Sequence, residues 1–117
     1  MTAARELLES FHSCLPLFIA LGDETRLSII EVLAEEAFTK PQPSGPIDFE
    51  QHALNVNEIT QRTSLSRPAI SHHLKILKDA GLVSVRQEGT ANYYYLSMRD
   101  SNRKLMDLGY KLEEFIY

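Results

Sequence analysis

The clearest pattern of hydrophobic and polar positions lies between residues 66 and 81. At a helical angle of about 100° per residue, Ile70, Leu74 and Leu77 fall on one side. The other side is polar and cationic and carries Arg67, Ser71, His72, Lys75 and Lys78. Ser66 suits the N-cap, because its hydroxyl can accept a backbone N–H, and Gly81 suits the position after the helix end. The pattern predicts a well-bounded amphipathic helix.

A shorter helix is predicted just before it. Asn55 can cap this helix, and Glu58, three residues further on, can bond back to the backbone of the cap. The connection over residues 63–65 has the length found in a helix-turn-helix, whose second helix enters the major groove of DNA. We therefore predict a helix-turn-helix over residues 55–81.

Two strands are predicted after these helices. Residues 82–88 and 91–96 have the pattern of strands, and Gly89 and Thr90 join them. A hairpin placed directly after a helix-turn-helix is a candidate wing. We assign the wing to residues 82–96.

Three blocks of sequence then occur in a recognisable order between residues 16 and 98. The first is Ala20-Leu21-Gly22-Asp23-Glu24-Thr25-Arg26-Leu27. The second is Ser71-His72-His73-Leu74-Lys75-Ile76-Leu77 with Ala80-Gly81-Leu82-Val83, and the third is Glu88-Gly89-Thr90 with Tyr94-Tyr95-Leu96. Together they resemble the ArsR/SmtB type of winged helix-turn-helix repressor, in which Glu24 would usually be proline. The resemblance implies a mainly α fold with a β-hairpin wing, and a DNA-binding homodimer joined through its terminal helices.

Both ends of the chain carry wide apolar stripes at helical spacing. Pro16 is expected to kink or break the segment over residues 3–21, so two helices or one bent helix both fit. Each stripe either closes the core of its own subunit or forms a dimer interface, and the resemblance to a family of homodimers favours the interface. The expected interface residues are Leu7, Phe11, Leu105, Leu108, Leu112 and Phe115.

Asp23 can cap a helix that runs from Glu24 to about Glu36. Its buried positions are expected among Leu27, Ile30, Val32, Leu33 and Ala34. Arg26 is predicted to have a structural role or to clamp the backbone. The helix is followed by the insert over residues 38–54.

Residues 38–54 form an insert where the resembled family usually has a short link. Three prolines and a glycine between residues 40 and 46 exclude regular structure there. We expect a variable loop rather than a lid over a ligand, with Ile47, Phe49 and Leu54 able to fasten its second half to the body. Long loops in compact domains are often functional or disordered.

The 117 residues fit a single domain, and a composition of 44% hydrophobic and 24% charged residues is that of an ordinary globular protein. No apolar run approaches the roughly 20 residues of a membrane span, and the N-terminus lacks the pattern of a signal peptide. Cys14 is the one cysteine, which fits a reducing compartment. We expect a cytoplasmic protein without membrane contact.

The net charge of −4 is unusual for a DNA-binding protein, so its distribution matters. Residues 1–63 carry four basic and ten acidic side chains, a net charge of −6, whereas residues 64–92 carry four basic and two acidic, a net charge of +2. Phosphate contacts supply most non-specific affinity for DNA. The basic charge is therefore concentrated where a DNA surface is predicted, the alternative being an ordinary solvated helix face.

The DNA contacts are expected from the start of the second helix and from the wing. The candidates are Ser66, Arg67, Ser71 and His72, with Lys75 on phosphate, and Arg86 and Thr90 in the wing. Arg67 is best able to read guanine, because its guanidinium can bond O6 and N7 together. His73 falls on the packing side and is predicted to be a satisfied core histidine.

The signal that such a regulator would sense is not apparent. Many members of the resembled family bind metal through paired cysteines in the first helix of the helix-turn-helix or through Asp and His on the last helix, and both patterns are missing. His12 and Cys14 are two residues apart, which on a helix places them on different faces. We predict no metal site and no cofactor. The signal would then be an unidentified small-molecule inducer or oxidation of Cys14.

These observations favour a homodimeric transcriptional regulator that binds double-stranded DNA and acts as a repressor at an imperfect palindrome, with half-sites spaced by about 10 bp or a multiple. The alternative is a winged-helix module that binds a protein partner and has vestigial DNA binding. No arrangement of catalytic residues stands out, so an enzyme is not expected.

Overall fold

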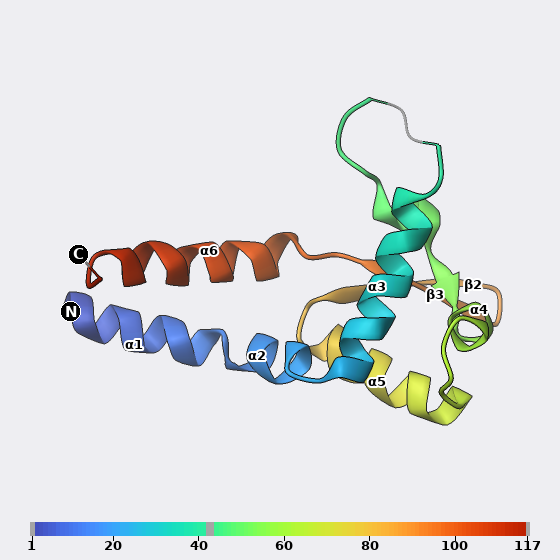
Figure 1. Cartoon of the computed structure of the whole chain (residues 1–117), viewed down its shortest axis with the longest axis horizontal. Helices are drawn as coiled ribbons and strands as arrows, with labels where there is room; N and C mark the ends of the chain where they lie inside the picture. The colour runs from blue at the N-terminus through green and yellow to red at the C-terminus, as the bar shows by residue number, and fades with distance from the viewer. Residues whose placement is uncertain (1, 42–43, 117) are drawn as a thin grey trace.

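A computed structural model describes residues 2–41 and 44–116, and these residues form six α-helices and a small antiparallel sheet (Figure 1). The elements are α1 (Ala3–Ser13), α2 (Leu15–Leu21), α3 (Glu24–Phe38), a 3₁₀ turn η1 (Phe49–His52), β1 (Leu54–Asn55), α4 (Val56–Gln61), α5 (Arg67–Asp79), β2 (Val83–Glu88), β3 (Ala91–Leu96) and α6 (Arg99–Glu113). The predicted mainly α fold, a winged helix-turn-helix with a hairpin wing, is confirmed. No described helix is long and apolar enough to cross a membrane.

The N-terminal segment forms two helices rather than one bent helix. The break falls at Cys14, and Pro16 sits in the first turn of α2. A first turn has no intrahelical partners for its amides, so proline is tolerated there but not in the middle of a helix. The proline therefore decides where the second helix starts.

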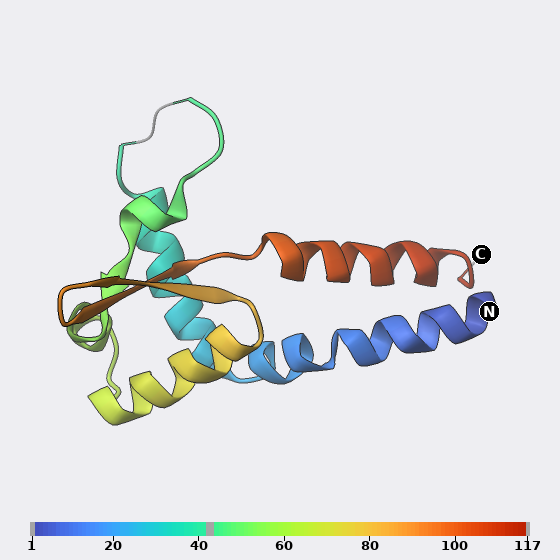
Figure 2. The ribbon, with the colours of Figure 1, turned by 180° about the vertical axis from the view of Figure 1, so that it is seen from behind.

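Helices α1 and α6 run antiparallel and form an arm that projects from the body, with both chain ends at its tip (Figure 2). Ser10 donates a hydrogen bond to Asp107 across the arm at 3.3 Å, and the Cys14 thiol lies 3.5 Å from the Lys104 carbonyl. Leu108 is 6% exposed in the core of its own subunit. The arm is thus packed within one chain.

The core lies between α3, α5 and the inner face of the sheet. Ile70, Leu74 and Leu77 of α5 are fully buried, as their spacing predicts. On α3 the prediction was partly wrong, because Ile29 is fully buried whereas Leu27 is 40% exposed. This helix has hydrophobic residues around much of its surface, so its sequence does not fix which face turns inward.

The helix-turn-helix follows its local sequence signals. Asn55 accepts a hydrogen bond from the Glu58 backbone at 2.8 Å, and the Glu58 carboxylate accepts one from the Asn55 backbone at 3.0 Å. Ser66 caps α5 by accepting the amide of Ala69 at 3.4 Å. Gly81, with φ of 79°, ends the helix in the left-handed region that favours glycine.

The sheet has three strands in the order β1-β3-β2, one more than the hairpin predicted from the sequence. In the hairpin, Val83 pairs with Leu96 and Arg86 with Tyr93. The added strand comes from the end of the insert, where Leu54 pairs with Tyr94. A two-residue strand has no periodicity of its own, which is why the sequence did not indicate it.

The insert has two different halves. Its first half projects from the body as a loop (Figure 1), and Gln42 and Pro43 of the predicted loop lie outside the described residues. Its second half forms η1 and β1. The ring of Phe49 packs edge-on against Phe38 with centroids 5.9 Å apart, and Leu54 is 2% exposed. Phe49 and Leu54 therefore fasten the second half to the body, as predicted.

Glu36 joins α3 to the helix-turn-helix connection. Its carboxylate lies 2.6 Å from Nη2 of Arg62 and 3.3 Å from Nζ of Lys40, and the side chain is 14% exposed. Burial acts to raise the pKa of Glu36, but hydrogen bonds from Arg62 and Lys40 outweigh it and hold the pKa below its usual value.

We predict that Glu36→Gln lowers the free energy of unfolding by about 0.5–1 kcal/mol at neutral pH. A carboxylate with a depressed pKa in the folded protein contributes stability that is fully present above its unfolded pKa and is lost as pH falls through the folded pKa. In urea unfolding curves the difference from wild type should therefore shrink as the pH falls below the usual range of a glutamate pKa and through the lowered pKa of folded Glu36. Exposed Glu35→Gln is the control, and a difference that persisted at acidic pH would contradict this account.

Candidate nucleic-acid interface

The exposed face of α5 presents most of the predicted DNA contacts together. Arg67, Ser71, His72 and Lys75 are all exposed, on the side of the helix opposite its buried leucines. Figure 1 shows α5 along the lower edge of the body, away from the insert loop. The guanidinium of Arg67 makes no hydrogen bond or ion pair with any residue in the described ranges, and neither does the Ser71 hydroxyl. These side chains are available to a ligand.

Two predicted contacts on α5 have partners within the chain. The Ser66 hydroxyl is used in the N-cap. Lys75 forms an ion pair with Asp79 one turn away, at 2.9 Å, and both side chains are well exposed, at 75% and 63%. Exposed pairs of this kind are worth only a few tenths of a kcal/mol, so a phosphate can displace Asp79.

His73 lies on the packing side of α5, as predicted. The ring is half-buried, and its Nδ1 lies 3.3 Å from Nη1 of Arg26. Arg26 also donates to two backbone carbonyls of α2, so its predicted role as a backbone clamp is confirmed. The neighbouring His72 points outward, with the two ring centroids 5.4 Å apart.

The wing presents its two predicted contacts differently. Thr90 is exposed at the tip of the hairpin, next to Gly89 with φ of 60°. Arg86 lies on the outer face of the sheet and is only 34% exposed. Its guanidinium donates to the Glu50 carbonyl at 2.9 Å, lies 3.1 Å from the Glu88 carboxylate, and sits 5.7 Å from the ring centre of Tyr93.

Arg86 therefore connects the wing to the insert. Glu50 belongs to η1, and its carboxylate lies 3.9 Å from the same guanidinium. A contact between Arg86 and DNA would first have to break these interactions. Among the seven residues predicted to contact DNA, Arg86 is held most firmly by hydrogen bonds and ion pairs within the described chain. No local pattern indicates this pair, because Glu50 lies 36 residues from Arg86 in the sequence.

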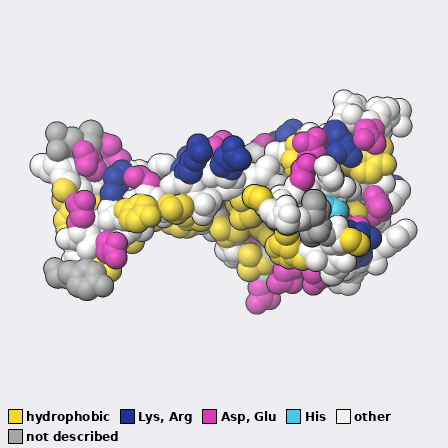
Figure 3. All heavy atoms as spheres, turned by 90° about the horizontal axis from the view of Figure 1, so that it is seen from above, with side chains coloured by type: hydrophobic (Ala, Val, Ile, Leu, Met, Phe, Trp, Pro, Cys, Tyr) yellow, Lys and Arg dark blue, Asp and Glu magenta, His cyan; other side chains and the backbone are white. Residues whose placement is uncertain are grey.

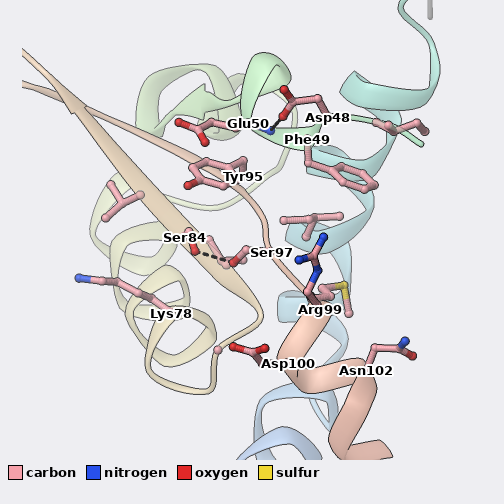
Figure 4. Close-up of a pocket in the computed structure, with 16 residues that line it drawn as sticks. Asp48, Phe49, Glu50, Lys78, Ser84, Tyr95, Ser97, Arg99, Asp100 and Asn102 are labelled. Carbon is pink, nitrogen blue, oxygen red and sulfur yellow. Dashed lines mark hydrogen bonds between the residues drawn. The ribbon is translucent and has the colours of Figure 1, made fainter. Parts of the chain in front are cut away.

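A groove runs between the insert, the sheet and the start of α6 (Figure 4). The hydroxyls of Ser84 and Ser97 meet on its floor at 2.5 Å, beside the ring of Tyr95. Charged side chains of both signs line it, namely Asp48, Glu50, Lys78, Arg99 and Asp100. Its lining includes Glu50, the partner of Arg86, and Lys78 in the last turn of α5.

No three His, Cys, Asp or Glu side chains converge as a metal site would require anywhere in residues 2–41 and 44–116. Cys14 is fully buried at the break between α1 and α2, whereas His12 is exposed. The two side chains thus face different surroundings. The absence of a metal cofactor stays a prediction.

The predicted dimer residues separate into two groups. Leu108 is buried, and Leu7, Leu105 and Leu112 are half-buried against the core of their own chain. Phe11 and Phe115 are 39% and 48% exposed. The assignment of all six residues to a dimer interface stays a prediction.

A further apolar surface lies beside Phe11. The exposed large hydrophobic side chains of the helical arm and of α2 include Leu8, Leu15, Phe18, Ile19, Met106 and Tyr110, at 40–64% exposure. Leu8, Phe11, His12, Leu15 and Phe18 line one shallow groove. Figure 3 shows hydrophobic side chains along the arm, next to Lys and Arg side chains. Apolar patches of this kind usually mark an interaction site.

The chain is similar in sequence to known bacterial and archaeal regulatory proteins. Residues 49–85 match the model of the bacterial regulatory protein, arsR family. An uncharacterised HTH-type transcriptional regulator of Methanocaldococcus jannaschii is 37% identical over 89 residues, which are 76% of this chain and 83% of that protein. The arsenical resistance operon repressor of Bacillus subtilis is 30% identical over 102 residues, covering 87% of this chain and 80% of that one.

A solved structure is similar over almost the full length. It is the homodimeric winged helix-turn-helix DNA-binding domain of a possible ArsR-family regulator from Mycobacterium bovis, with a TM-score of 0.59 and 25% identity. The match covers 99% of this chain and 90% of that domain.

We predict that Arg86→Ala loosens the insert and changes DNA affinity by less than about 2-fold, since a lost phosphate contact would cost more. Backbone amides of η1 should exchange with solvent faster, because Glu50 loses the guanidinium that holds it. Hydrogen exchange of residues 48–53 measures the first effect and a binding titration the second. Exposed Gln87→Ala on the same strand is the control. Unchanged exchange together with a clear loss of affinity would show that Arg86 contacts DNA instead.

Proposed function

This chain belongs to the arsR family of bacterial regulatory proteins, whose members are transcriptional regulators and not enzymes, and we propose that it is a homodimeric repressor of a palindromic operator. The observation that carries the proposal is the exposed face of α5. A rigid helix in a helix-turn-helix presents Arg67 and Ser71 without engaging them elsewhere in the described chain. We expect the protein to act in the cytoplasm and without a metal cofactor.

In this proposal α5 enters the major groove of DNA. Its N-terminal half, with Ser66, Arg67, Ser71 and His72, reaches base edges and nearby phosphates. Arg67 recognises guanine through two parallel hydrogen bonds. Lys75, further along, exchanges its ion pair with Asp79 for one with a phosphate, and Thr90 follows the DNA backbone from the wing tip.

Charge distribution supports specific over non-specific binding. The acidic residues 1–63 repel DNA from the rest of the surface, whereas the α5 face remains cationic. Repulsion of this type lowers the affinity for unrelated sequences more than it lowers the affinity for a site read through base contacts. A repressor that must distinguish one operator from many competing sites benefits from this difference.

The exposed apolar surface supports a homodimer. Phe11, Leu15 and Phe18 would be covered by a second copy, as would Phe115 near the tip of the arm. The similar M. bovis domain is homodimeric, and the similar B. subtilis protein is a repressor. Two copies related by a twofold axis would present two α5 helices to half-sites about 10 bp apart or a multiple of it, and occupation of a promoter would block transcription.

The first prediction from this proposal concerns base reading. Duplexes that wild-type protein selects from a random pool should bind Arg67→Ala more weakly by about 1–3 kcal/mol, and this variant should lose discrimination at one base pair in each half-site. Titrations against the selected duplex and its single-base variants measure both effects. Arg103→Ala, which removes an exposed arginine from α6, is the control for net charge. Full affinity and full discrimination in Arg67→Ala would contradict the assignment.

Phosphate contact is tested separately with Lys75→Ala. This variant should weaken binding to all duplexes alike and reduce the slope of log K against log [salt] by about 0.9 for each lost contact. The same salt series on wild type separates DNA binding from the alternative of a protein-interaction module, since binding of no duplex by the wild type would favour that alternative.

The dimer surface is tested with Phe11→Glu. A carboxylate buried between two apolar surfaces costs several kcal/mol, so this variant should sediment as a monomer at concentrations where wild type is a dimer. Ser13→Glu places the same charge on the opposite exposed side of α1 and should remain dimeric. Sedimentation equilibrium decides, and a dimeric Phe11→Glu protein would move the interface elsewhere.

A further inference from the structure

Arg26 makes polar contacts that join three helices. It lies in the first turn of α3, and its side chain is 11% exposed. Nε donates to the Ala20 carbonyl at 2.8 Å and Nη2 to the Ile19 carbonyl at 3.0 Å, both near the end of α2. Nη1 lies 3.3 Å from Nδ1 of His73, in the middle of α5. One guanidinium thus holds the end of α2 and the middle of α5.

The two carbonyls are acceptors that a helix end leaves open. The last carbonyls of a helix have no intrahelical partner and lie at the negative end of its dipole, where a cation is favoured. Asp23 adds to the arrangement, because it accepts the Arg26 backbone amide at 3.1 Å and lies 3.9 Å from the guanidinium. The planar fork of arginine serves several acceptors at once, which the single ammonium of lysine cannot do in the same geometry.

His73 must be the acceptor in its contact with Arg26. Arginine has only donors, so Nδ1 of His73 carries a lone pair and the ring proton sits on Nε2. The contact therefore requires an acceptor at the δ position of residue 73. Asparagine provides one there and leucine does not, which gives a matched pair of substitutions.

This contact links the arm to the DNA-reading helix. Helix α2 continues from α1, which packs against α6, so the end of α2 is where the arm meets the body. Helix α5 packs on α3, and the Arg26 guanidinium adds a directional polar link between α5 and that junction. In a dimer joined through the arms, the orientation of α5 relative to its own arm sets the separation of the two α5 helices.

We propose that Arg26 and His73 are positioning residues that fix α5 relative to the arm and thereby restrict the half-site spacing that the protein accepts. The statement on spacing rests on the proposed function, whereas the statement on orientation concerns a single chain. One added base pair moves two half-sites apart by about 3.4 Å and rotates one against the other by about a tenth of a turn. Only a firmly oriented α5 can discriminate against so small a change.

The orientation is measured with two spin labels in one chain. Labels at Glu9→Cys on α1 and Lys78→Cys on α5, both exposed positions, report the distance between arm and reading helix. The background is Cys14→Ser, whose hydroxyl can keep the bond to the Lys104 carbonyl, and dilution with unlabelled protein removes signals between subunits. His73→Leu should widen the distance distribution about twofold, because α5 loses a supporting hydrogen bond. His73→Asn and the exposed control His72→Leu should leave it narrow.

The consequence for DNA is measured with the duplex that wild type selects from a random pool, and with the same duplex lengthened by one central base pair. Wild type and His73→Asn should bind the lengthened duplex about 10-fold more weakly, whereas His73→Leu should lose less than about 3-fold. Circular dichroism and sedimentation establish that each variant is folded and dimeric.

A His73→Leu protein with the wild-type distance distribution would overturn the inference. If His73→Leu widened the distance distribution but still bound the lengthened duplex about 10-fold more weakly, the part of the inference that concerns half-site spacing would be wrong. A wild type that selects no duplex, or that is monomeric, would contradict the proposed function and the spacing statement. In that case the label distances alone would still decide whether Arg26 and His73 orient α5.

Discussion

The burial of one face of α5 is the constraint on which the rest of this structure depends. Ile70, Leu74 and Leu77 are fully buried against α3 and the sheet, and each contributes about 1.5–3 kcal/mol relative to an exposed position. Because these residues fix the rotation of the helix about its axis, Arg67 and Ser71 must project outward. The outward direction of the cationic face is therefore a consequence of packing.

Helix α5 is defined by capping residues at its two ends and by one polar contact in its middle. Ser66 and Gly81 define where the helix starts and stops, and the Arg26 guanidinium holds it at His73. On the far side of the sheet the insert is held in the same manner, with Arg86 of the wing donating to Glu50. In both places an arginine side chain donates to backbone carbonyls of another element, and so joins segments that are separate in the sequence.

The parts of the fold that the sequence predicted are those with local signals. The cap at Asn55, the spacing of Ile70, Leu74 and Leu77, and the turn at Gly89 act over a few residues, so the helix-turn-helix and the wing were predicted nearly to the residue. Strand β1 and the Arg86 contact were not, because each depends on a partner more than thirty residues away. Helix α3 shows a third case, since Leu27 and Ile29 are equally apolar and only the tertiary arrangement decides which is buried.

A hydroxyl-radical footprint of the protein on the duplex it selects, combined with the number of chains bound per duplex, examines both the reading helix and the dimer. We expect two chains per duplex and two protected segments about 10 bp apart, or a multiple of it, arranged about a twofold axis. A single protected segment bound by one chain, or uniform protection of any duplex, would contradict a dimer that reads DNA with two oriented α5 helices.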